Sequence, residues 1–216
     1  MSDEPPVIAV HVSAAERRGI RSGTADVSPE ASLAESVSVW HLAQVREGAI
    51  LGENVIIGRG AYIGPGVKVG ANCKIQNYAL LYEPASLDEG VFIGPAVILT
   101  NDRRPRAVNG DGLQKTSQDW EHVGVTIGFG ASIGARAVCI APVRIGQWAM
   151  VAAGSVVSDD VAPHALVAGT PAVRIGWVSR TGARLVADDY VPRQLVCPDS
   201  GAVFIERDGE VQEINS

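Results

Sequence analysis

The chain has 216 residues, of which 46% are hydrophobic and 19% charged, enough apolar material for one domain with a continuous core. Its formal net charge of −6 argues against a surface that binds nucleic acid or an anionic membrane. Small neutral or anionic ligands remain compatible with this charge.

Residues 1–26 mix charged, Pro and Gly residues around the apolar run 7–10. This pattern predicts a partly disordered N-terminal segment with one edge strand. The first residues lack the basic and apolar regions of a signal peptide, and no apolar run approaches the ~18 residues of a membrane span. We therefore expect a cytoplasmic protein with no membrane partner.

From residue 27 to residue 99 every sixth residue is aliphatic, and the residue four places after each is small or is Val, except for Arg103 after Leu99. The aliphatic set is Val27, Leu33, Val39, Val45, Leu51, Ile57, Ile63, Val69, Ile75, Leu81, Leu87, Ile93 and Leu99. A period of six fits neither a lone helix nor a simple strand. It is typical of an all-β solenoid in which short strands meet at corners and about 18 residues close one three-sided coil.

The repeat stops over residues 100–126 and resumes at Ile127. Coils on both sides of this gap need each other to cover their ends, so the gap predicts a long looped-out excursion, a feature more often functional than decorative. The repeat region is therefore 27–178. Residues 179–216, with turn signals at 198–201 and 208–209, predict a C-terminal extension that ends in a small hairpin.

Residues eighteen apart are expected to stack in columns on the outside of the coils. One column holds His41, Arg59 and Asn77, and beside it Trp40 and Gln76 alternate with glycines, which predicts a recess. On the adjoining face Glu83 lies below Asn101 with Tyr82 beside it. An acid, an amide and an aromatic ring thus border the root of the excursion.

After the excursion the outward positions are nearly free of side chains. Such a smooth stripe exposes backbone N–H and C=O groups to an extended ligand, and a pantetheine arm, itself a chain of amides, suits it. The alternative is that small residues merely form the corners. The stripe comprises Gly134, Ala135, Ala152, Ala153 and Gly154.

The three cysteines are too few and too scattered for a disulfide framework or a Cys-x-x-Cys metal site. Cys73 and Cys139 fall on core positions of the repeat, and Cys197 begins a turn. We expect no metal.

The closing stretches 143–157 and 163–172 resemble the coenzyme A end of the hexapeptide-repeat, left-handed parallel β-helix acyltransferases. A narrower resemblance is to nucleotide-sugar 3-N-acetyltransferases, which act on UDP-2-acetamido-3-amino-2,3-dideoxy-glucuronate or on dTDP-3-amino-dideoxyhexoses. Tyr78 departs from this group, which often has a second Asn there. The matching segments are 39–41, 74–77, 91–95, 100–102, 105–106, 175–177 and 197–198.

The resemblance implies a homotrimer with active sites between subunits, acetyl-CoA as co-substrate, and direct attack of a sugar amine on the thioester. It implies that Asn77 and Asn101 orient the sugar, while a backbone N–H near Gly94 or the smooth stripe holds the thioester oxygen. His122, at the end of the excursion, is the histidine best placed to act as base. Further contacts are implied at Arg106 for the acceptor and at Gly169 and Arg174 for coenzyme A.

The alternative functions fall into two classes. An O-acetyltransferase or a small-amine acetyltransferase would use the same scaffold and differ only in its acceptor. A metal hydratase of the γ-carbonic-anhydrase type needs three converging imidazoles, and the spacing of His11, His41, His122 and His164 offers no such set.

Overall fold

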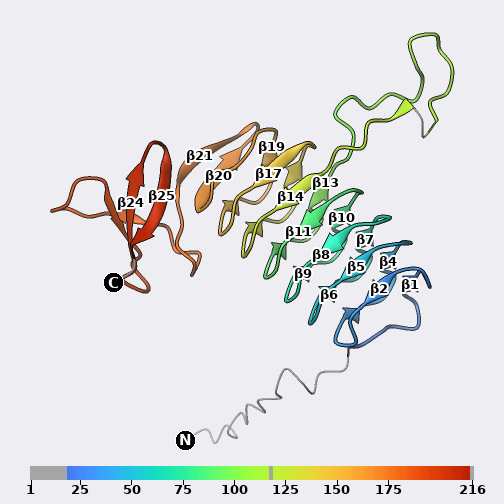
Figure 1. Cartoon of the computed structure of the whole chain (residues 1–216), viewed down its shortest axis with the longest axis horizontal. Helices are drawn as coiled ribbons and strands as arrows, with labels where there is room; N and C mark the ends of the chain where they lie inside the picture. Colours follow the sequence, from blue (N-terminus) through green and yellow to red (C-terminus); the bar gives the residue numbers. More distant parts are fainter. Residues whose placement is uncertain (1–18, 117–118, 215–216) are drawn as a thin grey trace, which may run out of the picture.

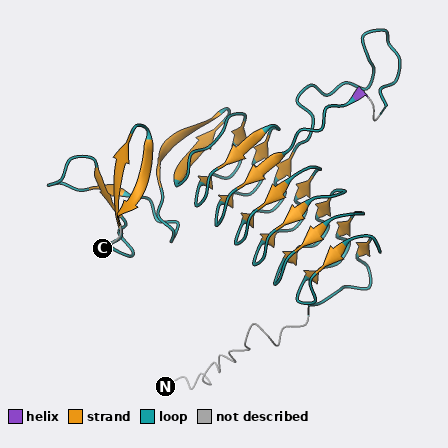
Figure 2. Ribbon diagram, in the orientation of Figure 1, coloured by secondary structure: helices purple, strands orange, loops and turns teal. Residues whose placement is uncertain are grey.

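The computed structural model describes residues 19–116 and 119–214, and these form a long parallel β-solenoid followed by a small antiparallel sheet (Figures 1 and 2). The edge strand predicted at 7–10 and His11 lie outside the described residues. No helix within the described ranges is long and apolar enough to cross a membrane.

Three sheets form the walls of the solenoid, and all their strands run parallel except the last strand of wall 3, which pairs antiparallel with the strand before it. Wall 1 contains β1 (Asp26–Val27), β4 (Gln44–Val45), β7 (Tyr62–Ile63), β10 (Leu80–Leu81), β13 (Ile98–Leu99), β16 (Val138–Cys139) and β19 (Val156–Val157). Wall 2 contains β2 (Ser32–Leu33), β5 (Ile50–Leu51), β8 (Lys68–Val69), β11 (Ser86–Leu87), β14 (Val125–Ile127) and β17 (Val143–Ile145). Wall 3 contains β3 (Ser38–Val39), β6 (Ile56–Ile57), β9 (Lys74–Ile75), β12 (Phe92–Ile93), β15 (Ser132–Ile133), β18 (Met150–Val151), β20 (Ala165–Gly169) and β21 (Ala172–Trp177).

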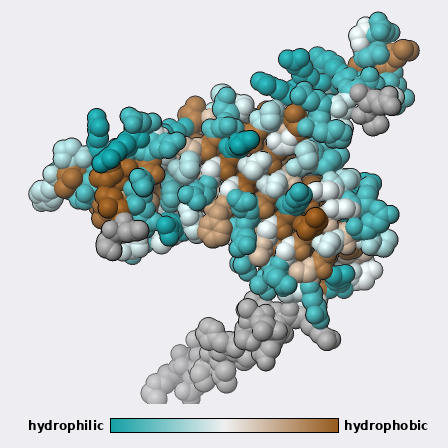
Figure 3. Space-filling view, in the orientation of Figure 1, coloured by the Kyte–Doolittle hydropathy of each residue, from teal (hydrophilic) through white to brown (hydrophobic). Residues whose placement is uncertain are grey.

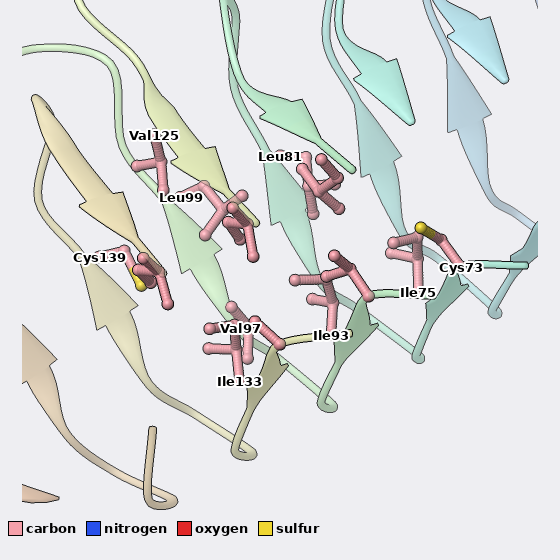
Figure 4. Packing of buried hydrophobic residues seen from close by; sticks show 14 of the residues in the cluster. Cys73, Ile75, Leu81, Ile93, Val97, Leu99, Val125, Ile133 and Cys139 are labelled. Carbon is pink, nitrogen blue, oxygen red and sulfur yellow. The ribbon is translucent and has the colours of Figure 1, made fainter. Parts of the chain in front are cut away.

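Strands in neighbouring coils pair eighteen residues apart, as the repeat predicts. Val39 pairs with Ile57 and Ile57 with Ile75 in wall 3. The second residue of each short strand points inward, because side chains alternate along a strand. Ile57, Ile75 and Leu99 are all 0% exposed, and Figure 4 shows the inward side chains of successive coils packed on one another. The predicted core is confirmed.

The excursion is confirmed and slightly shorter than predicted. Ile98 pairs with Val138, forty residues later, so 22 residues beyond the usual eighteen are looped out between the coils. The excursion spans 100–124, because residues 125 and 126 already belong to β14. It projects away from the solenoid in Figure 1.

The chain ends in a four-stranded antiparallel sheet rather than a lone hairpin. Its strands are β22 (Val186–Ala187), β23 (Gln194–Val196), β24 (Val203–Arg207) and β25 (Glu210–Ile214). The turn predicted at 208–209 joins β24 to β25. Phe204 of β24 is fully buried, meets the ring of His164 and belongs to the same hydrophobic cluster as the solenoid interior, so the sheet packs on the last coil.

We expect Ile75→Ala to lower the free energy of unfolding by about 2–5 kcal/mol, since it leaves a cavity in a closely packed interior. Its neighbour Lys74 is exposed on the same strand, so Lys74→Ala serves as control and should change stability by less than about 0.5 kcal/mol. Urea titration followed by circular dichroism measures both. Equal losses in the two variants would contradict the inward orientation of the repeat.

Candidate functional site

The predicted recess lies on the corner that follows wall 3, the wall 3 corner, which comprises residues 40–42, 58–60, 76–78, 94–96, 134–136 and 152–154. A cavity of about 330 Å³ opens there. Its lining confirms that the column runs through three coils. The lining residues are Trp40, His41, Ile56, Gly58, Arg59, Ile75, Gln76 and Asn77.

The side-chain amide of Asn77 uses its oxygen in a hydrogen bond within the solenoid and leaves its nitrogen available to a ligand. Its Oδ1 accepts a hydrogen bond from the backbone N–H of Arg59, 2.9 Å away in the preceding coil. Among the described residues its Nδ2 has no hydrogen-bond partner. Gly58 makes this approach possible, because a Cβ there would lie 2.7 Å from Asn77 Oδ1. The Asn77 amide is thus held in place with a free donor at the recess.

His41 is held by the first turn of the described chain. Its Nδ1 lies 2.7 Å from Ser22 Oγ and 3.0 Å from Thr24 Oγ1. Nε2 remains without a partner among the described residues, and the side chain is exposed. Trp40 beside it is 40% exposed. Trp40 therefore offers a flat aromatic surface to a ligand, and His41 offers one imidazole nitrogen.

Tyr78 takes the left-handed conformation of the corner with φ of 60°. Its hydroxyl accepts a hydrogen bond from Arg59 Nε at 3.2 Å. Its ring covers Gly60, where a Cβ would lie 2.6 Å from a ring carbon. The tyrosine thus fixes Arg59 at the rim, a contact that the sequence did not predict because the two residues occupy different columns.

The small-residue stripe continues the same corner upward. Register places Gly94, Gly134 and Ala152 in one column above Gln76. A Cβ on Gly94 would lie 2.6 Å from the backbone N of Ala135, and one on Gly134 would lie 2.4 Å from that of Ala153. Coil stacking therefore requires these two glycines, as the alternative interpretation held.

The same stacking leaves backbone donors open on this corner. The N–H groups of Ala135 and Ala153 have no acceptor among the described residues, and each lies beside a glycine that has no side chain to cover it. The N–H of Gly94 itself donates to Ile133 O at 2.8 Å. The donor predicted near Gly94 is therefore the N–H of Ala135 in the next coil, because the Gly94 N–H is used by the ladder.

The upper end of the stripe is only partly available. Nothing lies within 4 Å of a Cβ built on Gly154, so that position is open. Gly169 ends β20, and its N–H donates to Ser155 Oγ at 3.3 Å. Arg174 pairs with Glu206 of the C-terminal sheet at 3.1 Å and lies 4.2 Å from the centre of the Trp177 ring. Its predicted contact with coenzyme A competes with both partners.

A second cluster occupies the corner that follows wall 1, the wall 1 corner. Glu83 lies in the same column as Asn101, as predicted from the spacing. Tyr82 packs on Tyr62 with ring centres 5.3 Å apart. Oε2 of Glu83 is buried and has no hydrogen-bond partner among the described residues. Arg46 and Tyr62 belong to this cluster too, and the sequence did not single them out.

The excursion returns beside this second cluster. A Cβ on Gly124 would lie 3.0 Å from the backbone carbon of Pro84. The last residue of the excursion, just before β14, therefore lies next to Glu83 at the wall 1 corner. His122, two residues earlier, is exposed and packs on Trp120 with ring centres 4.5 Å apart. Arg106 is exposed in the outer part of the excursion and donates to Pro105 O at 3.0 Å.

The predicted site residues thus fall into two groups on different corners of one chain. Asn77, His41, Trp40 and Gln76 share the wall 3 corner with the stripe. Asn101, Tyr82, Glu83 and the return of the excursion share the wall 1 corner. Within one chain, wall 1 separates the two groups.

His164 has a structural role in this chain. It is 5% exposed, its Nδ1 lies 2.9 Å from Val178 O, and its ring meets Phe204 of the C-terminal sheet edge-on at 5.3 Å. Burial lowers the pKa of this imidazole, opposed by the hydrogen bond to the Val178 carbonyl. It anchors the last coil to the extension.

The cysteines behave as predicted for the core. Cys73 and Cys139 are fully buried, and burial raises the pKa of their thiols to about 11 and about 12. Cys197 is also buried, and its Sγ donates to Ser179 Oγ at 3.2 Å. Within the described ranges no group of three His, Cys, Asp or Glu residues is arranged to hold a metal ion.

A family profile described as the hexapeptide repeat of succinyl-transferase matches residues 48–77 and 124–159. Over 85 residues the chain is 40% identical to a dTDP-3-amino-3,6-dideoxy-alpha-D-galactopyranose 3-N-acetyltransferase of Aneurinibacillus thermoaerophilus, covering 39% of this chain and 42% of that protein. Over 105 residues it is 34% identical to serine acetyltransferase 4 of Arabidopsis thaliana, covering 49% of this chain and 29% of that protein. The chain thus spans less than half the length of either relative.

Among solved structures, a hexapeptide transferase family protein from Anaplasma phagocytophilum matches 73% of this chain and 81% of its own, at 18% identity and a TM-score of 0.48.

The burial of His164 predicts a pH-dependent loss of stability. Because the folded chain favours the neutral imidazole, stability is fully present above the ordinary pKa of 6.5 and falls as pH drops below it, when the unfolded chain binds the proton more readily. In His164→Asn, which keeps a side chain that tolerates a positive φ, this loss between pH 7 and pH 5 should shrink. Melting temperatures over this range measure it; identical pH profiles in both proteins would contradict the anchor role.

Proposed function

The chain belongs to the hexapeptide-repeat proteins, and we propose that it is an acetyl-CoA-dependent N-acetyltransferase that acetylates the 3-amino group of a nucleotide-linked sugar. The observation that carries this proposal is that the recess at Asn77 and the small-residue stripe share one corner of the solenoid. A ligand lying along the stripe is therefore directed into the recess. Identity to a nucleotide-sugar 3-N-acetyltransferase supports the choice of acceptor.

The stripe suits the pantetheine arm of the donor. From Asn77 to Ala153 the column climbs three coils, or about 14 Å at the ~4.8 Å spacing of paired strands. An extended chain of amides matches this length, and the open N–H groups of Ala135 and Ala153 are donors for its carbonyls. In this arrangement the thioester reaches the recess while the nucleotide end of coenzyme A lies toward Gly154.

The reaction transfers an acetyl group to nitrogen. The neutral amine attacks the thioester carbonyl carbon, the carbon–sulfur bond breaks, and the departing thiolate takes the proton that the nitrogen loses. Positioning supplies most of the acceleration, since a well-oriented pair of reactants gains about 7–11 kcal/mol against the 10²–10⁴-fold of a general base. The free Nδ2 of Asn77 orients the sugar or donates to the thioester oxygen.

A homotrimer with sites between subunits accounts for the division of polar residues between two corners. Half-buried apolar side chains follow one another up the outer face of wall 1, which lies between those corners: Leu80, Ile98, Val138 and Val156. A second copy that covers this wall brings its own corners to the edge of the first. We infer that Asn77 of one copy and Asn101 of another serve the same acceptor.

The acceptor distinguishes this proposal from its alternatives. The scaffold suits an O-acetyltransferase or a small-amine acetyltransferase equally well, so acetyl-CoA hydrolysis alone does not decide. Thiol release is measured with UDP- and dTDP-linked 3-amino sugars, their 3-hydroxy analogues and free small amines. Turnover with the 3-hydroxy sugars or the small amines alone would overturn the proposed acceptor.

We expect Asn77→Asp to lower kcat about 10²–10³-fold, since it removes one preorganised donor. The carboxylate keeps an oxygen that accepts from the Arg59 N–H, so the solenoid bond is retained and the melting temperature should stay close to wild type. His122→Ala is the comparison, and it should retain most turnover. The reverse pattern, with loss in His122→Ala and not in Asn77→Asp, would establish a histidine base.

Mixing experiments test whether sites are shared. Asn77→Asp and Asn101→Ala chains, each with little activity alone, are unfolded and refolded together. Random assembly pairs intact Asn77 with intact Asn101 at about one site in four when the two come from different copies of a symmetric oligomer. Recovery of about a quarter of wild-type turnover supports a shared site, and no recovery places both residues in one chain.

A further inference from the structure

The carboxylate of Glu83 lacks the partner that its counterpart has two coils earlier. Glu47 and Glu83 occupy the same column of the wall 1 corner, 36 residues apart. Both oxygens of Glu47 accept hydrogen bonds at 2.9 Å from Arg46, the residue that precedes it. The residue that precedes Glu83 is Tyr82, which carries no charge.

The surroundings of Glu83 keep water from its inner oxygen without replacing the lost contacts. Oε2 is buried against Gly64, where an added Cβ would lie 2.7 Å from it. The rings of Tyr62 and Tyr82 pack on each other at this corner. The pKa of Tyr62 is raised first by its burial and then by the charge of Glu83.

Arg46 does not compensate this charge. Its guanidinium forms an ion pair with Glu47, and Nη1 donates a hydrogen bond to the Tyr62 hydroxyl at 3.5 Å. A buried carboxylate oxygen without a donor costs free energy of folding, so a chain that retains one gains something else from it. Glu83 lies beside Asn101 and the end of the excursion, so the gain that we infer is a contact with the acceptor.

We propose that Glu83 is a specificity-determining residue that accepts a hydrogen bond from a donor group of the acceptor sugar, either a hydroxyl or the protonated amine of the encounter complex, which releases its extra proton to solvent before the neutral nitrogen attacks. This inference rests on the proposed function. Oε2 faces inward, but the Glu83 side chain as a whole is only half-buried, so a donor of the acceptor reaches the carboxylate from its exposed side. A sugar without that group leaves the carboxylate without a donor. Glu83 thereby rejects such analogues more strongly than an apolar contact could.

The test compares Glu83→Met with Glu47→Met. Met keeps the length of the side chain and removes both oxygens. Because Glu83 is unpaired in the free protein, Glu83→Met should melt at or above the temperature of wild type while kcat/KM for the acceptor falls about 10- to 100-fold, chiefly through KM. Glu47→Met, in the same column with a partly exposed pair, should change KM less than twofold.

Glu83→Gln separates the two donor groups, because an amide oxygen still accepts from a hydroxyl but carries no charge for an ammonium. KM near wild type in this variant identifies a hydroxyl, and KM as high as in Glu83→Met identifies the amine. Unchanged KM in Glu83→Met, or a clear drop in its melting temperature, would assign Glu83 to structure and overturn the inference. The proposed function fails separately, by absence of turnover in the wild-type protein.

Discussion

Successive coils are held together by backbone hydrogen bonds between strands that pair, within each uninterrupted stretch of the repeat, in a register of eighteen residues. Ile75 pairs with Ile93 in this way, and the neighbouring Gln76 N donates to Ile93 O at 2.9 Å. This register is the constraint on which the rest of the structure depends. It places each aliphatic side chain directly above another one and each outward residue in a fixed column. A one-residue slip would move the aliphatic set to the surface, because side chains alternate along a strand. Within each uninterrupted stretch of the repeat, the residue number of an outward side chain therefore determines the column in which it lies.

Tight stacking limits what the corners can carry. Several corner positions take a left-handed conformation without glycine, at a cost of roughly 1–2 kcal/mol each. Tyr78 and Trp148 are two of them, with φ of 60° and 58°. Each ring lies over a glycine eighteen residues earlier, Gly60 or Gly130, so that packing offsets the strain. Tyr78 is thus packed into the coil, and its hydroxyl accepts a hydrogen bond from Arg59 at the rim of the recess.

The sequence predicted the solenoid, its core and the columns, because a period of six acts through local geometry and needs no knowledge of distant contacts. It placed Ile75 inside and His41 with Asn77 on one corner, and both are confirmed. It did not predict the pairing of Arg174 with Glu206, because the C-terminal sheet has no repeat to fix its position. Nor did it predict that the Gly94 N–H is used by the ladder, since spacing identifies residues but not the direction of their backbone groups.

The shape of a single chain argues for a site completed by another copy. The walls of a solenoid are convex, so columns on different corners of one chain run parallel and never converge. The recess of about 330 Å³ is at the lower limit of cavities that enclose small ligands, roughly 300–1,000 Å³. A nucleotide sugar and a pantetheine arm together need more room than that. In the oligomer that we propose, a wall of another copy covers the recess at the wall 3 corner and supplies that room, while the excursion leaves the solenoid at the wall 1 corner, beside Glu83 and Asn101. Figure 3 shows hydrophobic residues interspersed among hydrophilic ones on one face of the solenoid.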